Sequence, residues 1–144
     1  MAYLIGANLT GAYASDANLT NADLSQSNLA NSWFGLYYDE YLYVPAANLM
    51  GANLAGADAG NANFAFVSLG NANLTQTNLT NAVFLAATLS GANLGQAIAN
   101  GGNFESATLT NANFSQSNLT NARFNGAILT GANFTGAEVH AANF

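Results

Sequence analysis

The sequence predicts an all-β solenoid, in which the chain winds as a four-sided coil around one narrow apolar core. Three observations support this fold class. Every fifth residue from Leu4 to Phe144 is Leu, Phe, Val or Ala, and Asp39 is the single exception among 29 positions. The residue two places before is Ala in 21 of those 29 cases. Residues twenty apart also resemble one another, as in the series Phe64, Phe84, Phe104, Phe124 and Phe144.

Each five-residue unit predicts one short straight edge and one corner. Side chains two apart on an extended strand share a face, and the residue between them points the other way. Ala and Leu or Phe therefore point inward, and the intervening residue, mostly Asn, points outward. The remaining two residues, such as Thr10-Gly11 and Ser90-Gly91, are types that favour turns. Such a unit cannot bury its own apolar face, so copies must stack.

The number of edges in one coil follows from the spacing at which residues repeat. Counting by twenty places seven leucines in one series: Leu9, Leu29, Leu49, Leu69, Leu89, Leu109 and Leu129. Four edges per coil is the interpretation that fits this series and the Phe series. The corner residues Gly51, Asn71, Gly91, Asn111 and Gly131 alternate. The residue type at this corner therefore repeats every two coils, about forty residues.

One irregular segment, Gly35 to Pro45, holds four of the six Tyr and the only Pro. If it stayed in line, Asp39 would occupy a core position and Tyr37 would replace a small Ala, and an unpaired buried carboxylate is very costly. We therefore expect one domain, residues 1–144, with a loop leaving the coil over roughly 35–44. Removing ten residues would place Phe34 below Phe64 and let Leu19 continue the Leu series. A distorted coil that stays in line is the alternative.

The units resemble those of the pentapeptide-repeat proteins, whose motif is Ala-(Asp/Asn)-Leu-x-x. Ala17-Asn18-Leu19-Thr20-Asn21 and Ala132-Asn133-Phe134-Thr135-Gly136 fit it directly, and the match covers nearly the whole chain. The resemblance implies a right-handed quadrilateral β-helix of about seven coils. It also implies a role in protein interaction, because some members resemble duplex DNA and bind a type II topoisomerase, DNA gyrase, in its place.

Composition excludes several kinds of chemistry. Charged residues make up 6% of the chain, against roughly 25% in an ordinary soluble domain. There is no Cys, which excludes disulfides and thiolate metal sites, and the seven acids are not spaced as metal ligands. The only His, His140, has Glu138 as its acidic neighbour, and a solvated surface pair is the expected reading. We expect no enzyme activity, no catalytic or metal site and no cofactor.

Targeting features are also missing from the sequence. No apolar run approaches the ~18 residues of a membrane-spanning helix, and no targeting segment is visible at Met1. We therefore expect a soluble protein without a membrane span. The compartment is undetermined, with the cytoplasm slightly favoured.

The candidate partner-binding residues are the aromatic and acidic side chains in and beside the irregular segment. They are Trp33, Tyr37, Tyr38, Asp39, Glu40, Tyr41 and Tyr43. Tyr and Trp are enriched at binding hot spots, so a scaffold or protein interaction module with an unknown partner is the main prediction. In the alternative interpretation, these Tyr residues fold back and cover the coil beneath them.

DNA mimicry needs more charge than this chain carries. A tube of about 6.7 coils at ~4.8 Å per coil would be ~32 Å long. Duplex DNA of that length carries about 19 negative charges at one per ~1.7 Å. The net charge here is -6, about a third of that requirement. Mimicry therefore stands as the alternative function, and direct nucleic-acid binding is not expected.

The repeats run to Phe144 without a capping segment, although terminal repeats normally need one. An open coil exposes unpaired backbone groups and offers a surface for stacking. We expect either a fragment of a longer protein or an end-to-end homodimer through the C-terminal coil.

Overall fold

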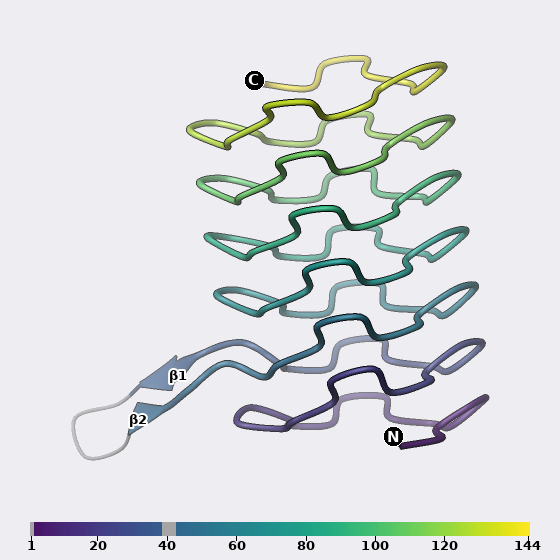
Figure 1. Ribbon diagram of the computed structural model, residues 1–144, viewed down its shortest axis with the longest axis vertical. Coiled ribbons are helices and arrows are strands. Elements are labelled where there is room, and N and C mark those ends of the chain that lie inside the picture. The colour runs from purple at the N-terminus through teal and green to yellow at the C-terminus, as the bar shows by residue number, and fades with distance from the viewer. Residues whose placement is uncertain (1, 39–42) are drawn as a thin grey trace.

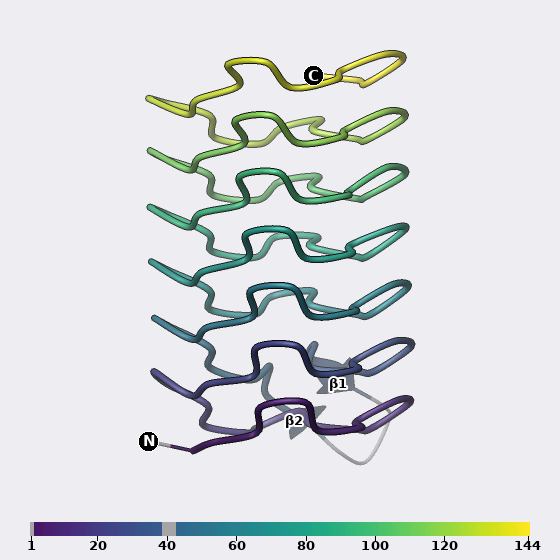
Figure 2. The same cartoon turned by 90° about the vertical axis from the view of Figure 1, so that its right-hand side faces the viewer.

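Each five-residue unit forms one side of a square coil. The structure is a computed structural model that describes residues 2–38 and 43–144. The described residues contain no helix, and the coils stack into a right-handed quadrilateral β-helix (Figures 1 and 2). Single parallel β-bridges join successive coils, generally between residues twenty apart, such as Asn53 with Asn73 and Asn73 with Asn93. The predicted all-β fold of about seven four-sided coils is confirmed.

The bridged residues define four outer faces, named here in the order in which the chain visits them. Face 1 carries Tyr3, Asp23, Asn53, Asn73, Asn93, Asn113 and Asn133. Face 2 carries Asn8, Asn28, Asp58, Asn78, Ile98, Asn118 and Glu138. Face 3 carries Tyr13, Trp33, Asn63, Val83, Asn103, Arg123 and Asn143. Face 4 carries Asn18, Asn48, Ser68, Thr88, Thr108 and Ile128.

Backbone hydrogen bonds hold each rung of the stack. The Leu74 N–H donates to the Asn93 carbonyl at 2.7 Å, and the Asn93 N–H donates to the Ala72 carbonyl at 2.9 Å. At the corner before face 1 the Ala92 N–H donates to the Leu89 carbonyl at 3.0 Å. Because these bonds recur around the coil, the backbone polar groups of the central coils are paired without regular strands.

At the corner after face 4, Asn and Gly alternate and pack closely between coils. The second corner residue is left-handed throughout this column, with φ of 56° at Asn71 and 69° at Gly91, a region that Gly and Asn tolerate best. A Cβ atom at Gly91 would overlap Oδ1 of Asn71 in the preceding coil. Asn111 and Gly131 repeat this arrangement. Each Asn side chain fills the space that the following Gly leaves open.

The core is a column of apolar side chains along the tube axis. Phe34, Phe64, Phe84, Phe104 and Phe124 are fully buried, and neighbouring rings stack with centroids 4.9–5.3 Å apart. A second pair, Phe114 and Phe134, meets this column edge to face. The Phe series predicted from the spacing of twenty is therefore a continuous ring stack.

Four inward positions that carry Ser or Thr in place of Ala are buried with their hydroxyl groups paired. The Ser27, Ser32 and Ser117 hydroxyls donate to the carbonyl three residues earlier at 2.6–2.7 Å, and that of Thr77 donates to Leu54 at 2.8 Å. A buried hydroxyl with an acceptor costs little, which explains why these replacements are tolerated.

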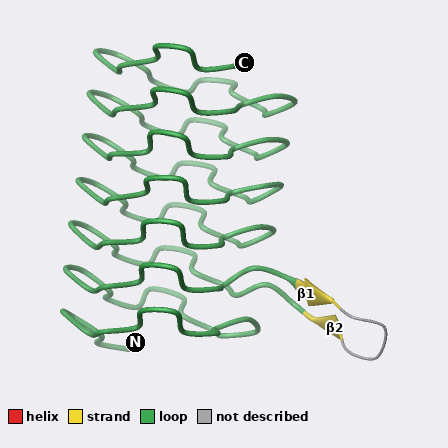
Figure 3. Cartoon of the chain, turned by 180° about the vertical axis from the view of Figure 1, so that it is seen from behind, coloured by secondary structure: helices red, strands yellow, loops and turns green. Residues whose placement is uncertain are grey.

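The stack is interrupted in its second coil, between faces 3 and 4. Bridged residues that straddle this point are thirty apart, as in Asn18 with Asn48 and Trp33 with Asn63. Leu19 therefore lies beneath Leu49, and Phe34 stacks on Phe64 at 5.3 Å. The uncorrected count by twenty is wrong for Leu9 and Leu29, which precede Ala59 in a different column. In the interruption, β1 (Tyr37–Tyr38) pairs with β2 (Tyr43–Val44), and both project from the tube (Figures 1 and 3).

Candidate interaction site

The hairpin of β1 and β2 is attached where one corner has been opened. At ordinary corners an N–H donates to the carbonyl three residues earlier, but the Phe34 carbonyl accepts from Ala47 at 2.8 Å. The Asp16 N–H donates to the Pro45 carbonyl at 2.8 Å, and the Ser15 hydroxyl donates to the Gly35 carbonyl at 2.6 Å. The first coil therefore holds both ends of the hairpin, and the coil itself continues in register.

The two sides of the hairpin have different surroundings. β1 and β2 are antiparallel, with Tyr37 opposite Val44 and Tyr38 opposite Tyr43. Successive side chains on a strand point to opposite sides, so Tyr37 shares one side with Val44 and Tyr38 shares the other with Tyr43. Tyr37 is 41% exposed, whereas Tyr38 is 72% and Tyr43 is 64% exposed. Only one side of the hairpin is therefore partly covered.

A pocket of about 390 Å³ lies between that side and the tube. Tyr13 and Ser15 of the first coil and Tyr37 and Val44 of the hairpin line it. Tyr13 is the most exposed aromatic residue here, at 84%, and it is bridged to Trp33 in the next coil. The pocket walls are thus two tyrosine rings, one valine and one serine, a combination that suits an apolar or aromatic group of a partner.

Trp33 precedes the hairpin on face 3. Its side chain is half-buried, and its indole N–H has no hydrogen-bond partner among the described residues. A buried donor that is left unpaired costs about 1–3 kcal/mol. Because this nitrogen is itself buried, the cost falls on the fold, and the exposed part of the ring is what a partner could contact.

The structure brings together part of the set predicted from the sequence. Tyr37, Tyr38 and Tyr43 share the hairpin, and Trp33 lies one residue before its base at Phe34. Asp39, Glu40 and Tyr41 lie outside the described residues. Tyr13 and Ser15 were missed, although the spacing of twenty between Tyr13 and Trp33 is visible in the sequence and places them in one column. Their role as a partner site stays a prediction.

Other charged groups of the described residues form no further site. Arg123 forms an ion pair with Glu105 at 3.3 Å on the surface, and such exposed pairs add little to the free energy of unfolding. The described residues contain no group of three or more His, Cys, Asp or Glu able to hold a metal ion. No described helix is long and apolar enough to cross a membrane.

Asp23 on face 1 makes stability depend on pH. Hydrogen bonds from the Ser25 hydroxyl, the Ser25 N–H and the Asn53 amide hold the pKa of Asp23 below its ordinary value. Because the folded pKa is lowered, this group stabilises the fold above its unfolded pKa, and that contribution is lost as pH falls through the folded pKa. We expect Asp23→Asn to match the wild type more closely at about pH 3 than at about pH 7 in guanidinium unfolding. An unchanged difference between the two pH values would contradict this.

The comparisons with known proteins agree with this geometry. The sequence matches a model of pentapeptide repeats in 8 copies, over residues 2–34, 47–85, 87–126 and 107–144. No curated protein matches it. The fold is similar to that of a trypsin-treated form of QnrB1, a plasmid-mediated fluoroquinolone resistance protein, at 21% identity and TM-score 0.76 over 87% of this chain and 58% of that chain. This chain thus spans less than two thirds of the QnrB1 form.

A second similar structure is a pentapeptide repeat protein from the thylakoid lumen of Arabidopsis thaliana. It is 25% identical with a TM-score of 0.65, and the match covers 75% of this chain and 68% of that chain.

Proposed function

The chain belongs to the pentapeptide-repeat family, and on that premise we propose that it is a non-enzymatic scaffold that presents its hairpin to a protein partner. The observation that carries the proposal is the exposure of Tyr38 and Tyr43 on the side of the hairpin that faces away from Tyr37 and Val44. Exposed aromatic side chains on a supported element are the residue types that dominate protein interfaces.

The stacked coils support this role mechanically. Hydrogen bonds to the first and second coils hold the base of the hairpin. Phe34, at this base, is fully buried in the core. A contact on such a support loses little conformational entropy when a partner binds, which favours affinity. The proposed contact set is the hairpin together with its flanking residue, namely Trp33, Tyr37, Tyr38, Asp39, Glu40, Tyr41 and Tyr43.

The acidic residues do not favour the alternative of DNA mimicry at a type II topoisomerase. Those in the described part of the chain are Asp16, Asp23, Asp58, Glu105 and Glu138. Asp23 lies on face 1, Asp58 and Glu138 lie on face 2, and Glu105 pairs with Arg123 on face 3. A mimic of duplex DNA needs charge in continuous rows, and these acids are scattered.

The proposal is tested with the double variant Tyr38→Ser/Tyr43→Ser. Because both rings are exposed, we expect the free energy of unfolding to change by no more than about 0.5 kcal/mol. Affinity for a partner should fall about 30-fold or more if these rings are hot spots. The measurement is affinity capture with the full chain as bait, followed by titration of the captured protein.

Tyr3→Ser is the matched control, because Tyr3 is an exposed tyrosine on face 1, away from the hairpin. Retained binding by the double variant would show that the rings do not contact the partner. A large loss of stability would show that they serve the fold. If the wild type inhibits gyrase supercoiling and the double variant inhibits it equally, the function moves to the mimicry alternative.

The proposal includes end-to-end association of two chains through the coil that carries Phe144. The Phe144 ring stacks on Phe124 at 5.0 Å and is 58% exposed, so a second coil laid on it would bury an aromatic surface. Sedimentation velocity over a range of concentrations should show a dimer, and a monomer at every concentration would contradict this part.

A further inference from the structure

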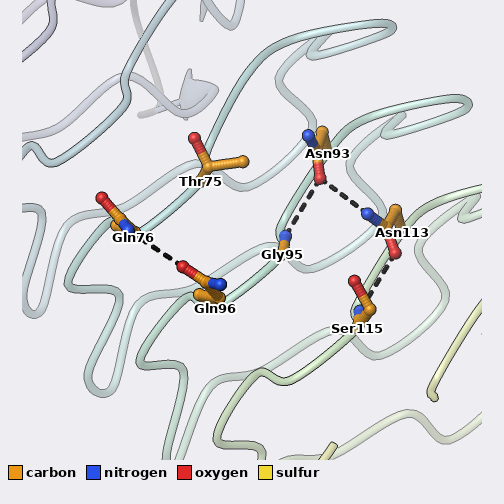
Figure 4. Close-up of a pocket in the computed structure, with 7 residues that line it drawn as sticks. All are labelled: Thr75, Gln76, Asn93, Gly95, Gln96, Asn113 and Ser115. Atoms are coloured by element: carbon orange, nitrogen blue, oxygen red, sulfur yellow. Dashed lines mark hydrogen bonds between the residues drawn. The ribbon is translucent and has the colours of Figure 1, made fainter. Parts of the chain in front are cut away.

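A polar notch lies on the tube at the corner that follows face 1. Its volume is about 340 Å³, and it is lined by Thr75, Gln76, Asn93, Gly95, Gln96, Asn113 and Ser115 (Figure 4). The notch exists because Gly95 interrupts a column of side chains between Thr75 and Ser115, the equivalent residues one coil before and one coil after. It lies far along the chain from the hairpin and shares no residue with the aromatic pocket.

The ladder of Asn side chains on face 1 is broken at this notch. The amide groups of Asn73, Asn113 and Asn133 each donate to the Oδ1 of the Asn in the preceding coil, at 2.9–3.2 Å. Asn93 makes no such bond to Asn73, whose Oδ1 accepts instead from the Thr75 hydroxyl at 2.8 Å. The Nδ2 group of Asn93 is therefore a hydrogen-bond donor without a partner in the described part of the chain.

Two other polar groups at the same corner are uncommitted, the Ser115 hydroxyl beside Gly95 and the Gln76 carbonyl at the outer edge of the notch (Figure 4). The Ser115 hydroxyl has no partner among the described residues. Gln76 donates to Gln96 at 2.9 Å and Gln96 donates to Gln116 at 3.0 Å, so Oε1 of Gln76 is left as a free acceptor at the start of this short ladder. Donors and acceptors that elsewhere satisfy each other between coils are thus available to a ligand here.

The chemistry of the lining selects the class of ligand. All seven lining residues are uncharged and none is aromatic, so a charged ligand would lose hydration without gaining a counter-charge. An apolar ligand would cover these polar groups and leave them unpaired. A ligand whose own groups both donate and accept hydrogen bonds can satisfy the free donor of Asn93 and the Ser115 hydroxyl together.

We propose that this notch binds a neutral saccharide, through Asn93 Nδ2 and the Ser115 hydroxyl, with Gln76 and Gln96 at its edge. Sugar hydroxyl groups both donate and accept, which matches the mixed set at this corner. Because these contacts exchange hydrogen bonds to water for hydrogen bonds to sugar, the net gain is small, and we expect a dissociation constant on the order of 1 mM. This site is independent of the function proposed for the hairpin.

The test is a titration of the full chain in which backbone amide NMR shifts are the readout. The neutral probes are glucose, N-acetylglucosamine and maltose, and glucuronate is the charged comparison. At least one neutral probe should give saturable shifts at Gly95, Gln96 and Ser115. The variant Gly95→Thr fills the notch with the residue found at Thr75 and Thr135, so the fold should accept it. We expect it to weaken binding at least tenfold.

Gly60→Thr is the matched control, because Gly60 holds the corresponding place after face 2, where Thr80 and Thr120 also occur. A Cβ at Gly60 would lie 3.4 Å from Asp58 Oδ1, and one at Gly95 would lie 3.2 Å from Asn93 Oδ1, so each change meets the side chain two residues earlier, somewhat more closely at Gly95. Gly60→Thr should bind like wild type, and Ser115→Ala should bind more weakly.

Three results would overturn the proposal. One is the absence of a saturable shift with any neutral probe. The second is equal binding by Gly95→Thr and Gly60→Thr. The third is a response confined to the hairpin or to glucuronate.

Discussion

Replacing Phe104 with Ala is expected to lower the free energy of unfolding by about 3–5 kcal/mol. The Phe104 ring is fully buried, stacks on Phe84 at 4.9 Å and on Phe124 at 5.0 Å, and meets Phe114 edge to face at 5.6 Å. Truncation removes the buried area and these ring contacts, and it leaves a cavity that the rigid coils above and below cannot close.

Guanidinium unfolding followed by circular dichroism measures the loss, and Phe144→Ala is the matched control. Phe144 stacks on Phe124 at 5.0 Å but is largely exposed, so its removal should cost much less than that of Phe104. Equal losses for the two variants would show that the ring stack is not what holds the coils together. A changed denaturant dependence would show that the stack unfolds in stages, as repeat proteins can.

Placing Asp at position 87 is expected to destabilise the protein by about 4 kcal/mol or more, whereas Asp at position 88 should change stability by no more than about 0.5 kcal/mol. Ala87 is buried to 1% exposure, and the described residues around it are apolar, so Ala87→Asp would put a carboxyl group into the core without a partner. Thr88 is the outward residue of face 4, and its hydroxyl has no hydrogen-bond partner in the described part of the chain.

The pair tests the inward and outward alternation at adjacent positions, because both variants add the same group to the same edge. Thermal unfolding of the two proteins at neutral pH gives the comparison. Similar melting temperatures for Ala87→Asp and Thr88→Asp would contradict the assignment of these side chains to opposite sides of the wall.

The coil could be predicted from the sequence because its determinants are local and repeated. Ala and Leu or Phe alternate with an outward residue in nearly every unit, so occasional departures such as Thr77 and Val67 do not obscure the pattern. Both of these residues are buried like the Ala that they replace. The spacing of twenty was also visible, since rings that stack on one another are of the same type.

The surface could be predicted only in part because its features depend on exceptions to the repeat. The aromatic segment was evident from composition, but the pairing of Tyr38 with Tyr43 is set by the register of a hairpin that has no repeat. Tyr13 joins the pocket through contact with a segment more than twenty residues later. The notch at Gly95 depends on one missing side chain and one hydrogen bond that shifts from Asn93 to Thr75, which no periodic pattern reveals.

The interlocking of Asn71 with Gly91 determines how such a tube can grow. A duplication of twenty residues would set two asparagines side by side at that corner, as Asn61 and Asn81 are at the corner after face 2, or two glycines, which would leave a gap. A duplication of forty residues keeps every Asn next to a Gly. Genetic lengthening or shortening of this chain, and any designed elongation, should therefore succeed most readily in steps of two coils.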